Sequence, residues 1–175
     1  KLTSLLIFVG LAFNVSGQEE PKNLKEAMDA AKAHWIIGDW ERKNADGTTF
    51  VISFKWAVKD GVVSLQVSRD GETTNQGVIG FDSASGKVVG KSMGRRGVSD
   101  SEWVVIEGKL FEVVKGKWKN PEGEITPFSF ARSHRKVDEN TMEATTHKVN
   151  DAGEVGEVAE RDGVKRISKW NRKKP

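Results

Sequence analysis

The chain has 175 residues, of which 37% are hydrophobic and 30% are charged, and its formal net charge is +3. This length is typical of one domain, and it is enough to bury a hydrophobic core without a disulfide or metal. The absence of Cys excludes disulfides, thiol nucleophiles and cysteine-ligated metal sites. The small net charge gives no indication of a specific nucleic-acid partner.

The first residues have the order of a secretory signal peptide. Lys1 precedes an apolar run at 5–13 (LLIFVGLAF), and small residues follow, with Val15 and Gly17 at spacing that suits cleavage after Gly17. The run is too short for a retained membrane helix, which needs about 20 residues. We therefore expect residues 1–17 to be a signal peptide and the mature protein to be exported, to the periplasm or outside the cell.

One short helix is predicted next. Leu24, Ala27, Met28 and Ala31 recur at helical spacing within 21–33 (PKNLKEAMDAAKA). The apolar stripe is narrow, so we expect this helix to lie against a larger body. Residues 18–34 are interpreted as this helix and a linker.

After residue 35 the apolar period changes to two, which is typical of β-strands. In the first such segment, Phe50, Ile52, Phe54 and Trp56 alternate with smaller or polar residues, and an Asp-Gly turn follows. Strands are predicted at 50–58, 63–68, 73–81, 87–93, 103–106, 110–118, 125–137, 141–149 and 164–170. A loop or irregular edge is predicted at 150–163 and a basic tail at 171–175.

The short links between these strands determine the expected architecture. Parallel pairing needs crossovers of about a dozen residues, so the sheet must be antiparallel. Closing a long meander into a barrel removes its edges. We therefore predict an all-β fold: an antiparallel up-and-down meander closing into a barrel over 35–170, with one short N-terminal helix. A strongly curled open sheet or a sandwich is the alternative.

The segment 35–40 (WIIGDW) brings a Gly-x-Trp step to the junction of the helix and the first strand. With 77–82 (GVIGFD), 85–88 (SGKV) and Trp103, it resembles the lipocalin-like (calycin-type) barrel domains of uncharacterised exported bacterial proteins, some of which follow SnoaL-like domains. The resemblance implies that Trp40 closes one barrel end against a basic side chain near the C-terminus, Arg166 or Arg172. It implies no activity, because these relatives have none assigned.

Aromatic and apolar residues on the predicted strands offer the main candidate ligand site. A barrel of about eight strands either encloses one small ligand or is filled by its own side chains. If there is a pocket, we expect its lining to include Phe50, Ile52, Phe54, Trp56, Trp103, Phe128 and Phe130.

Two histidines flank the turn predicted at 138–140. With that turn at the centre of a hairpin, His134 pairs near Thr145 and His147 near Arg132, which places both histidines on one face. Such a pair is a weak candidate for a metal site or a proton relay, and a single histidine for a haem ligand. We predict no cofactor and no metal.

The remaining motifs do not indicate an enzyme: the sequence has no nucleophile elbow, P-loop, HExxH or dinucleotide motif. The leading hypothesis is an exported monomeric barrel that binds a small apolar or amphipathic ligand. The alternative is a filled barrel that acts through its surface and its basic C-terminal residues, which would contact an anionic surface. Those residues are Lys165, Arg166, Lys169, Arg172, Lys173 and Lys174.

Overall fold

A computed structural model describes residues 20–95, 97–120 and 122–174. The predicted signal peptide at 1–17 lies outside these residues. The described chain contains one α-helix, α1 (Leu24–Ala30), and a 3-10 helix (His34–Ile36), followed by thirteen strands. The strands are β1 (Gly38–Lys43), β2 (Thr49–Val58), β3 (Val62–Arg69), β4 (Glu72–Asp82), β5 (Lys87–Gly94), β6 (Gly97–Ile106), β7 (Lys109–Lys119), β8 (Ile125–Asp138), β9 (Thr141–Val149), β10 (Val155–Val158), β11 (Glu160–Arg161), β12 (Val164–Lys165) and β13 (Ile167–Arg172).

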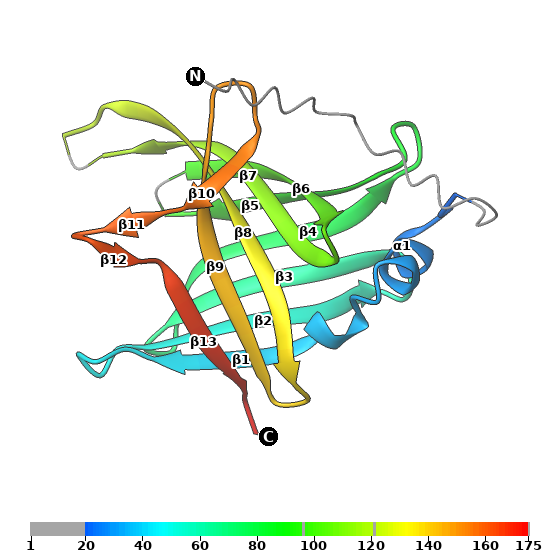
Figure 1. Ribbon diagram of the computed structural model, residues 1–175, viewed down its shortest axis with the longest axis horizontal. Helices are drawn as coiled ribbons and strands as arrows, with labels where there is room; N and C mark the ends of the chain where they lie inside the picture. The colour runs from blue at the N-terminus through cyan, green and yellow to red at the C-terminus, as the bar shows by residue number, and fades with distance from the viewer. Residues whose placement is uncertain (1–19, 96, 121, 175) are drawn as a thin grey trace, which may run out of the picture.

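Ten of these strands close into an antiparallel barrel (Figure 1). Each strand from β1 to β9 pairs with the next along the chain, and β13 pairs with both β9 and β1. An even number of strands lets the last one close antiparallel to the first. The predicted all-β meander barrel is confirmed, and the open sheet and the sandwich are excluded.

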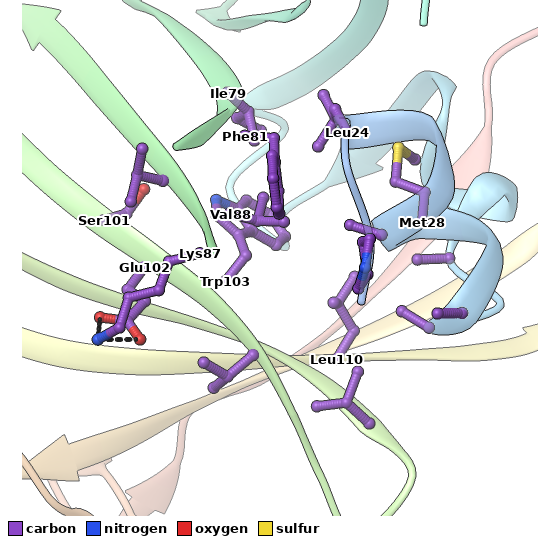
Figure 2. Close-up of a pocket in the computed structure, with 18 of the residues that line it drawn as sticks. Leu24, Met28, Ile79, Phe81, Lys87, Val88, Ser101, Glu102, Trp103 and Leu110 are labelled. Atoms are coloured by element: carbon purple, nitrogen blue, oxygen red, sulfur yellow. Dashed lines mark hydrogen bonds and ion pairs between the residues drawn. The ribbon is translucent and has the colours of Figure 1, made fainter. Parts of the chain in front are cut away.

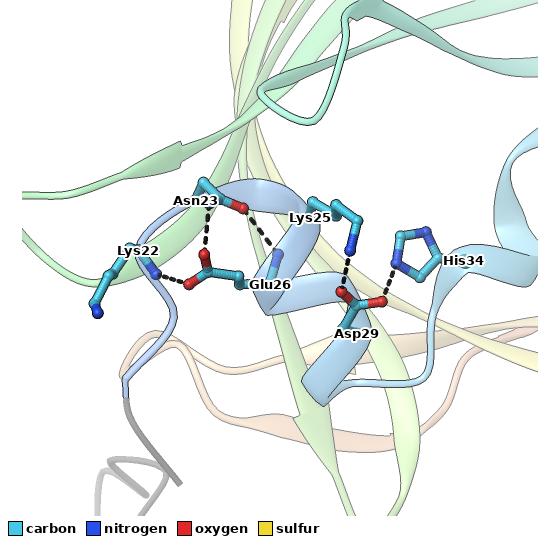
Figure 3. A network of polar contacts seen from close by, with 6 residues as sticks. All are labelled: Lys22, Asn23, Lys25, Glu26, Asp29 and His34. Atoms are coloured by element: carbon cyan, nitrogen blue, oxygen red, sulfur yellow. Dashed lines mark hydrogen bonds and ion pairs between the residues drawn. The ribbon is translucent and has the colours of Figure 1, made fainter.

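The helix α1 is shorter than the predicted 21–33 and lies across one end of the barrel (Figure 1). Its first turn is capped reciprocally: Glu26 N donates to Asn23 Oδ1 at 2.9 Å, and Asn23 Nδ2 donates to Glu26 Oε1 at 2.8 Å (Figure 3). At its other end, Asp29 contacts Lys25 Nζ at 2.6 Å and His34 Nε2 at 2.7 Å. Since His34 belongs to the 3-10 helix, this carboxylate ties the two helices together.

No helix in the described part of the chain is long and apolar enough to cross a membrane.

Strand alternation decides which side chains point into the barrel. Phe54 of β2 pairs with Leu65 of β3, and Ile79 of β4 pairs with Gly90 of β5, so these positions share one face of the sheet. The fully or nearly buried residues on this face form the core together with Leu24 of α1 and Ile36 of the 3-10 helix. The strand residues of this core include Trp40, Ile52, Phe54, Val63, Ile79, Trp103, Met142 and Trp170.

The C-terminal segment differs from the sequence-based prediction. Residues 150–163, expected as a loop or an irregular edge, include β10, whose pairing with β9 has a register shift, and the first strand of the β11–β12 hairpin. β10 pairs with the end of β9 at Val149 and His147, whereas β13 pairs with its beginning. β10 and β13 therefore lie beside different parts of the same strand, β9, and the β11–β12 hairpin separates them along the chain. Asn171 and Arg172, expected in the tail, belong to β13 and pair with β1.

Candidate functional site

An apolar chamber lies inside the barrel below α1. It is part of a pocket of about 2330 Å³. In Figure 2, Leu24 and Met28 of α1 lie on one side, and side chains from β4 to β7 lie on the other. These inner residues are Ile79, Phe81, Val88, Ser101, Trp103 and Leu110. All of them except Ser101 are apolar, so this space suits an apolar group.

The same pocket continues around the ends of β5 to β7 onto the outer surface. Its lining includes Val88 and Trp103, which point inward, and also Val89, Glu102 and Val104, which alternate with them and point outward. Glu102 pairs there with Lys87 at 3.0 Å, at the edge of the pocket (Figure 2). The volume is therefore shared between an inner chamber and an outer groove.

Trp103, which lines the inner chamber, belongs to a cluster of three buried rings. Trp103 stacks on His134, with ring centroids 5.4 Å apart, and Phe54 meets Trp103 edge-on at 6.2 Å. His134 is only 2% exposed. Within the described residues, Trp103 Nε1 and both ring nitrogens of His134 are buried without a hydrogen-bond partner. Most buried polar atoms in proteins are paired, so this cluster stands out as a candidate site.

An ion pair between a half-buried arginine and a buried carboxylate lies beside these rings. Arg132 Nη1 is 3.2 Å from Glu112 Oε2, and His134 Nε2 is 4.0 Å from the same oxygen. Burial raises the pKa of Glu112, and the charge of Arg132 opposes that rise. Burial, and secondarily Arg132, lowers the pKa of His134 to about 3. His134 is therefore neutral near pH 7, with one ring nitrogen as a donor and the other as an acceptor.

The opposite end of the barrel, at the turn over residues 44–48, carries arginines among aromatic rings. The guanidinium of Arg42 lies 4.8 Å from the ring centroid of Phe50 and 4.9 Å from that of Trp170. Arg132 lies 5.3 Å from the ring of Phe130, which stacks on Phe128 at 6.1 Å. We call this group the arginine end: Arg42, Phe50, Phe128, Phe130, Arg132 and Trp170.

The predicted pocket residues are thus divided between the two ends. Phe54 and Trp103 border the chamber below α1, whereas Phe50, Phe128 and Phe130 belong to the arginine end. Ile52 is buried in the core cluster on the same inner face. Trp56 is half-buried, with its ring 6.5 Å from that of His34.

Trp40 lies fully buried below the 3-10 helix, and the guanidinium of Arg172 stacks 4.3 Å from its ring centroid. Arg172 also donates to the carbonyl oxygens of Ile37 and Trp35, both at 3.0 Å. Of the two basic side chains considered for this position, Arg172 therefore occupies it. Arg166 is exposed, just before β13.

The two candidate histidines point to opposite faces of the sheet, so the expectation that they share a face is wrong. Near the turn, Asp138 pairs with Thr141 as predicted, but the register shifts between Lys136 and Asp138. This irregularity displaces the ladder by one residue, so His147 pairs with Ala131, the neighbour of Arg132, and lies on the other face from His134.

His147 instead belongs to an outer cluster beneath β10. Its Nε2 lies 3.0 Å from Ser133 Oγ, and its Nδ1 lies 3.3 Å from the carbonyl oxygen of Gly156. The ring of Phe111 packs against it at 5.3 Å. In the described part of the chain, no three His, Cys, Asp or Glu side chains gather as a metal site.

Sequence reasoning did not identify Arg42, Glu112 or Arg132 as site residues. The available signal was the alternation of side chains along the strands. Glu112 of β7 pairs with Arg132 of β8 and with Trp103 of β6, so the three side chains share one face of the sheet. Identifying a charged pair inside the barrel required knowing which face of these strands is the inner one.

Comparisons of the chain with protein-family models, curated proteins and solved structures returned no match.

Proposed function

We propose that this chain is an exported lipocalin-like barrel that binds a small apolar or amphipathic molecule in its interior as a monomer. The observation that carries the proposal is the apolar inner chamber, whose wall on the barrel side includes Ile79, Phe81, Val88 and Trp103. An apolar molecule, or the apolar body of an amphipathic one, would fill this space.

The apolar lining from three neighbouring strands supports the proposal. Ile79 and Phe81 of β4, Val88 of β5 and Trp103 of β6 all line the chamber. Export is supported by the residue pattern of 1–17.

The second candidate function is a filled barrel that acts through its surface and its basic C-terminal residues. It is favoured by the close packing around Trp40 and Met142, both 0% exposed. The two functions differ in one observable property, the saturable uptake of a small apolar molecule.

The test is a fluorescence titration with N-phenyl-1-naphthylamine, a neutral apolar dye. We expect the wild-type protein to bind it saturably. Val88→Trp places a large ring in the inner chamber and should weaken binding at least tenfold, or by about 1.4 kcal/mol. Val78→Trp adds the same ring at an outward position that is 51% exposed, and it should leave binding unchanged.

A third variant separates the chamber from the outer groove. Val89→Trp fills the groove on the neighbouring outward position. If Val89→Trp abolishes dye binding and Val88→Trp does not, the interior site is refuted. No saturable binding by the wild-type protein would favour the filled barrel. Native mass spectrometry of the protein from the exported fraction, before and after organic extraction, would test both export and a resident ligand.

A further inference from the structure

Arg42 occupies an unusual position for a cation. It lies on β1 opposite Phe50 and points into the barrel, where its guanidinium lies between the rings of Phe50 and Trp170. The two rings contact the guanidinium through cation–π interactions. These interactions supply no hydrogen-bond acceptor for its N–H groups, and Arg42 Nε is buried without an acceptor among the described residues.

The charges around Arg42 do not supply that acceptor. Burial, and then the positive charges of Arg132 and Arg166, lower the pKa of Arg42. Glu112, the buried carboxylate on the inner face, already lies 3.2 Å from Arg132. The arginine end therefore has more positive than negative charge.

Solvent reaches this end of the barrel. Arg132 points inward, as its pairing with Glu112 requires, yet its side chain is 34% exposed. Phe50, Phe128 and Phe130 are likewise inward-facing and only half-buried. An inward side chain of a closed barrel is exposed only where the barrel is open, so a solute can approach Arg42 and Arg132 from this end.

We infer that Arg42 and Arg132 bind the acidic group of an organic anion, whose apolar part lies among the aromatic rings of the arginine end. Guanidinium edges match the paired oxygens of carboxylate, sulfonate and phosphate groups. The adjoining rings of Phe50, Phe128 and Phe130 suit an apolar body and not a bare inorganic ion. This inference rests on the proposed function, because it requires that the interior admits a small molecule.

Two dyes that differ by one acidic group provide the test. 8-Anilinonaphthalene-1-sulfonate carries a sulfonate, and N-phenyl-1-naphthylamine is the same ring system without it. We expect the wild-type protein to bind the sulfonate at least tenfold more tightly than the neutral dye. This comparison needs no variant, so it holds even if a substitution prevents folding.

Arg42→Met retains the length of the side chain and removes its charge. It should weaken binding of the sulfonate about tenfold or more and leave the neutral dye within about twofold. Arg95→Met is the matched control, because Arg95 lies at the same end of the barrel, is 78% exposed and pairs with Glu72. It should leave both dyes unchanged. Near-UV circular dichroism should show that each variant is folded.

The outcomes separate the two proposals. If neither dye binds the wild-type protein, the proposed function fails. If both dyes bind equally and Arg42→Met changes neither, the barrel binds small molecules but the anion site is refuted. Dodecanoate should displace the sulfonate dye, and inorganic phosphate at the same ionic strength should not. Equal displacement by phosphate would refute the apolar part of the inference.

Discussion

The indole of Trp103 and the imidazole of His134 stack inside the barrel, with ring planes inclined by 17° and centroids 5.4 Å apart. Trp103 is on β6 and His134 is on β8, so the two rings meet over the strand between them. Both residues are buried, and their ring nitrogens have no partner among the described residues. The folded state therefore depends on a neutral His134.

This burial predicts a specific loss of stability in acid. The pKa of His134 is lowered from 6.5 to about 3 by burial, so the unfolded chain binds a proton between these values and the folded chain does not. The stability that depends on neutral His134 is present above pH 6.5 and is lost as the pH falls towards 3. The expected slope is about 1.4 kcal/mol per pH unit.

His134→Phe should remove this slope while keeping a ring against Trp103. Urea unfolding at pH 7, 6 and 5 measures the free energy of unfolding of both proteins, and their difference cancels most of the other titrating groups. The wild-type protein should lose more stability than the variant as the pH falls. Parallel pH profiles would contradict a buried neutral histidine.

The Glu112–Arg132 pair should contribute more to stability than an equally close surface pair. Both this pair and Arg135–Glu143 join N and O atoms at 3.2 Å. The side chains of Glu112 and Arg132 are 10% and 34% exposed, whereas those of Glu143 and Arg135 are 32% and 53% exposed. Arg132→Met leaves a buried carboxylate without its partner and should cost about 3 kcal/mol at pH 7. Arg135→Met should cost less than about 1 kcal/mol.

The pH dependence of the Arg132→Met variant provides a second readout. Burial raises the pKa of Glu112, so its carboxyl group can bind a proton above the range usual for glutamate. A protonated Glu112 does not need Arg132, so the cost of Arg132→Met should decrease as the pH is lowered from 7. Equal costs for Arg132→Met and Arg135→Met at pH 7 would show that the interior pair is as weak as a surface one.

Arg172 should be a major contact between the two ends of the chain. It donates to the carbonyl oxygens of Trp35 and Ile37 and stacks on Trp40. Arg172→Met should lower the free energy of unfolding by about 2–3 kcal/mol, because three hydrogen bonds to the carbonyl oxygens of Trp35, Ile37 and Glu139 are lost together with the stacking. Arg172→Lys should recover only part of this, since an ammonium group lacks the planar fork. Lys174→Met, at an exposed position, is the control for charge alone.

Gly38 is required by the same contact. Its φ is +134°, and a Cβ at this position would lie 2.3 Å from Arg172 Nη1. Gly38→Ala should destabilise the protein through both backbone strain and this clash. In the Arg172→Met background only the strain remains, so Gly38→Ala should cost less there. Additive free energies in this double-mutant cycle would show that Gly38 and Arg172 act independently.

The fold was largely predictable because its signals are local. Alternation at Phe50, Ile52, Phe54 and Trp56 predicted β2, and the Asp-Gly turn after it predicted the pairing with β3. Short links excluded parallel strands. The strands at 150–163 were not predicted, because that stretch is polar and lacks alternation. β10 is held there by pairing with β9 and by the contact of Gly156 with His147.

The candidate site was less predictable, because it depends on register. The hairpin of β8 and β9 begins in the expected register, but the irregularity before Asp138 shifts it by one residue and separates His134 from His147. Side chains alternate with a period of two, so a single extra residue exchanges the two faces. No local pattern marks Val137 as the place where this occurs.

By itself, the sequence determined the class of fold, the order and direction of the strands, and the alternation that gives each strand an apolar face. These properties depend on residues that are neighbours along the chain. Only the tertiary structure decided that Arg42, Glu112, Arg132 and His134 lie inside the barrel and that His147 lies outside. Burial, charge pairing and lowered or raised pKa values arise from contacts between strands that are distant in sequence, and a one-residue shift in pairing changes them all.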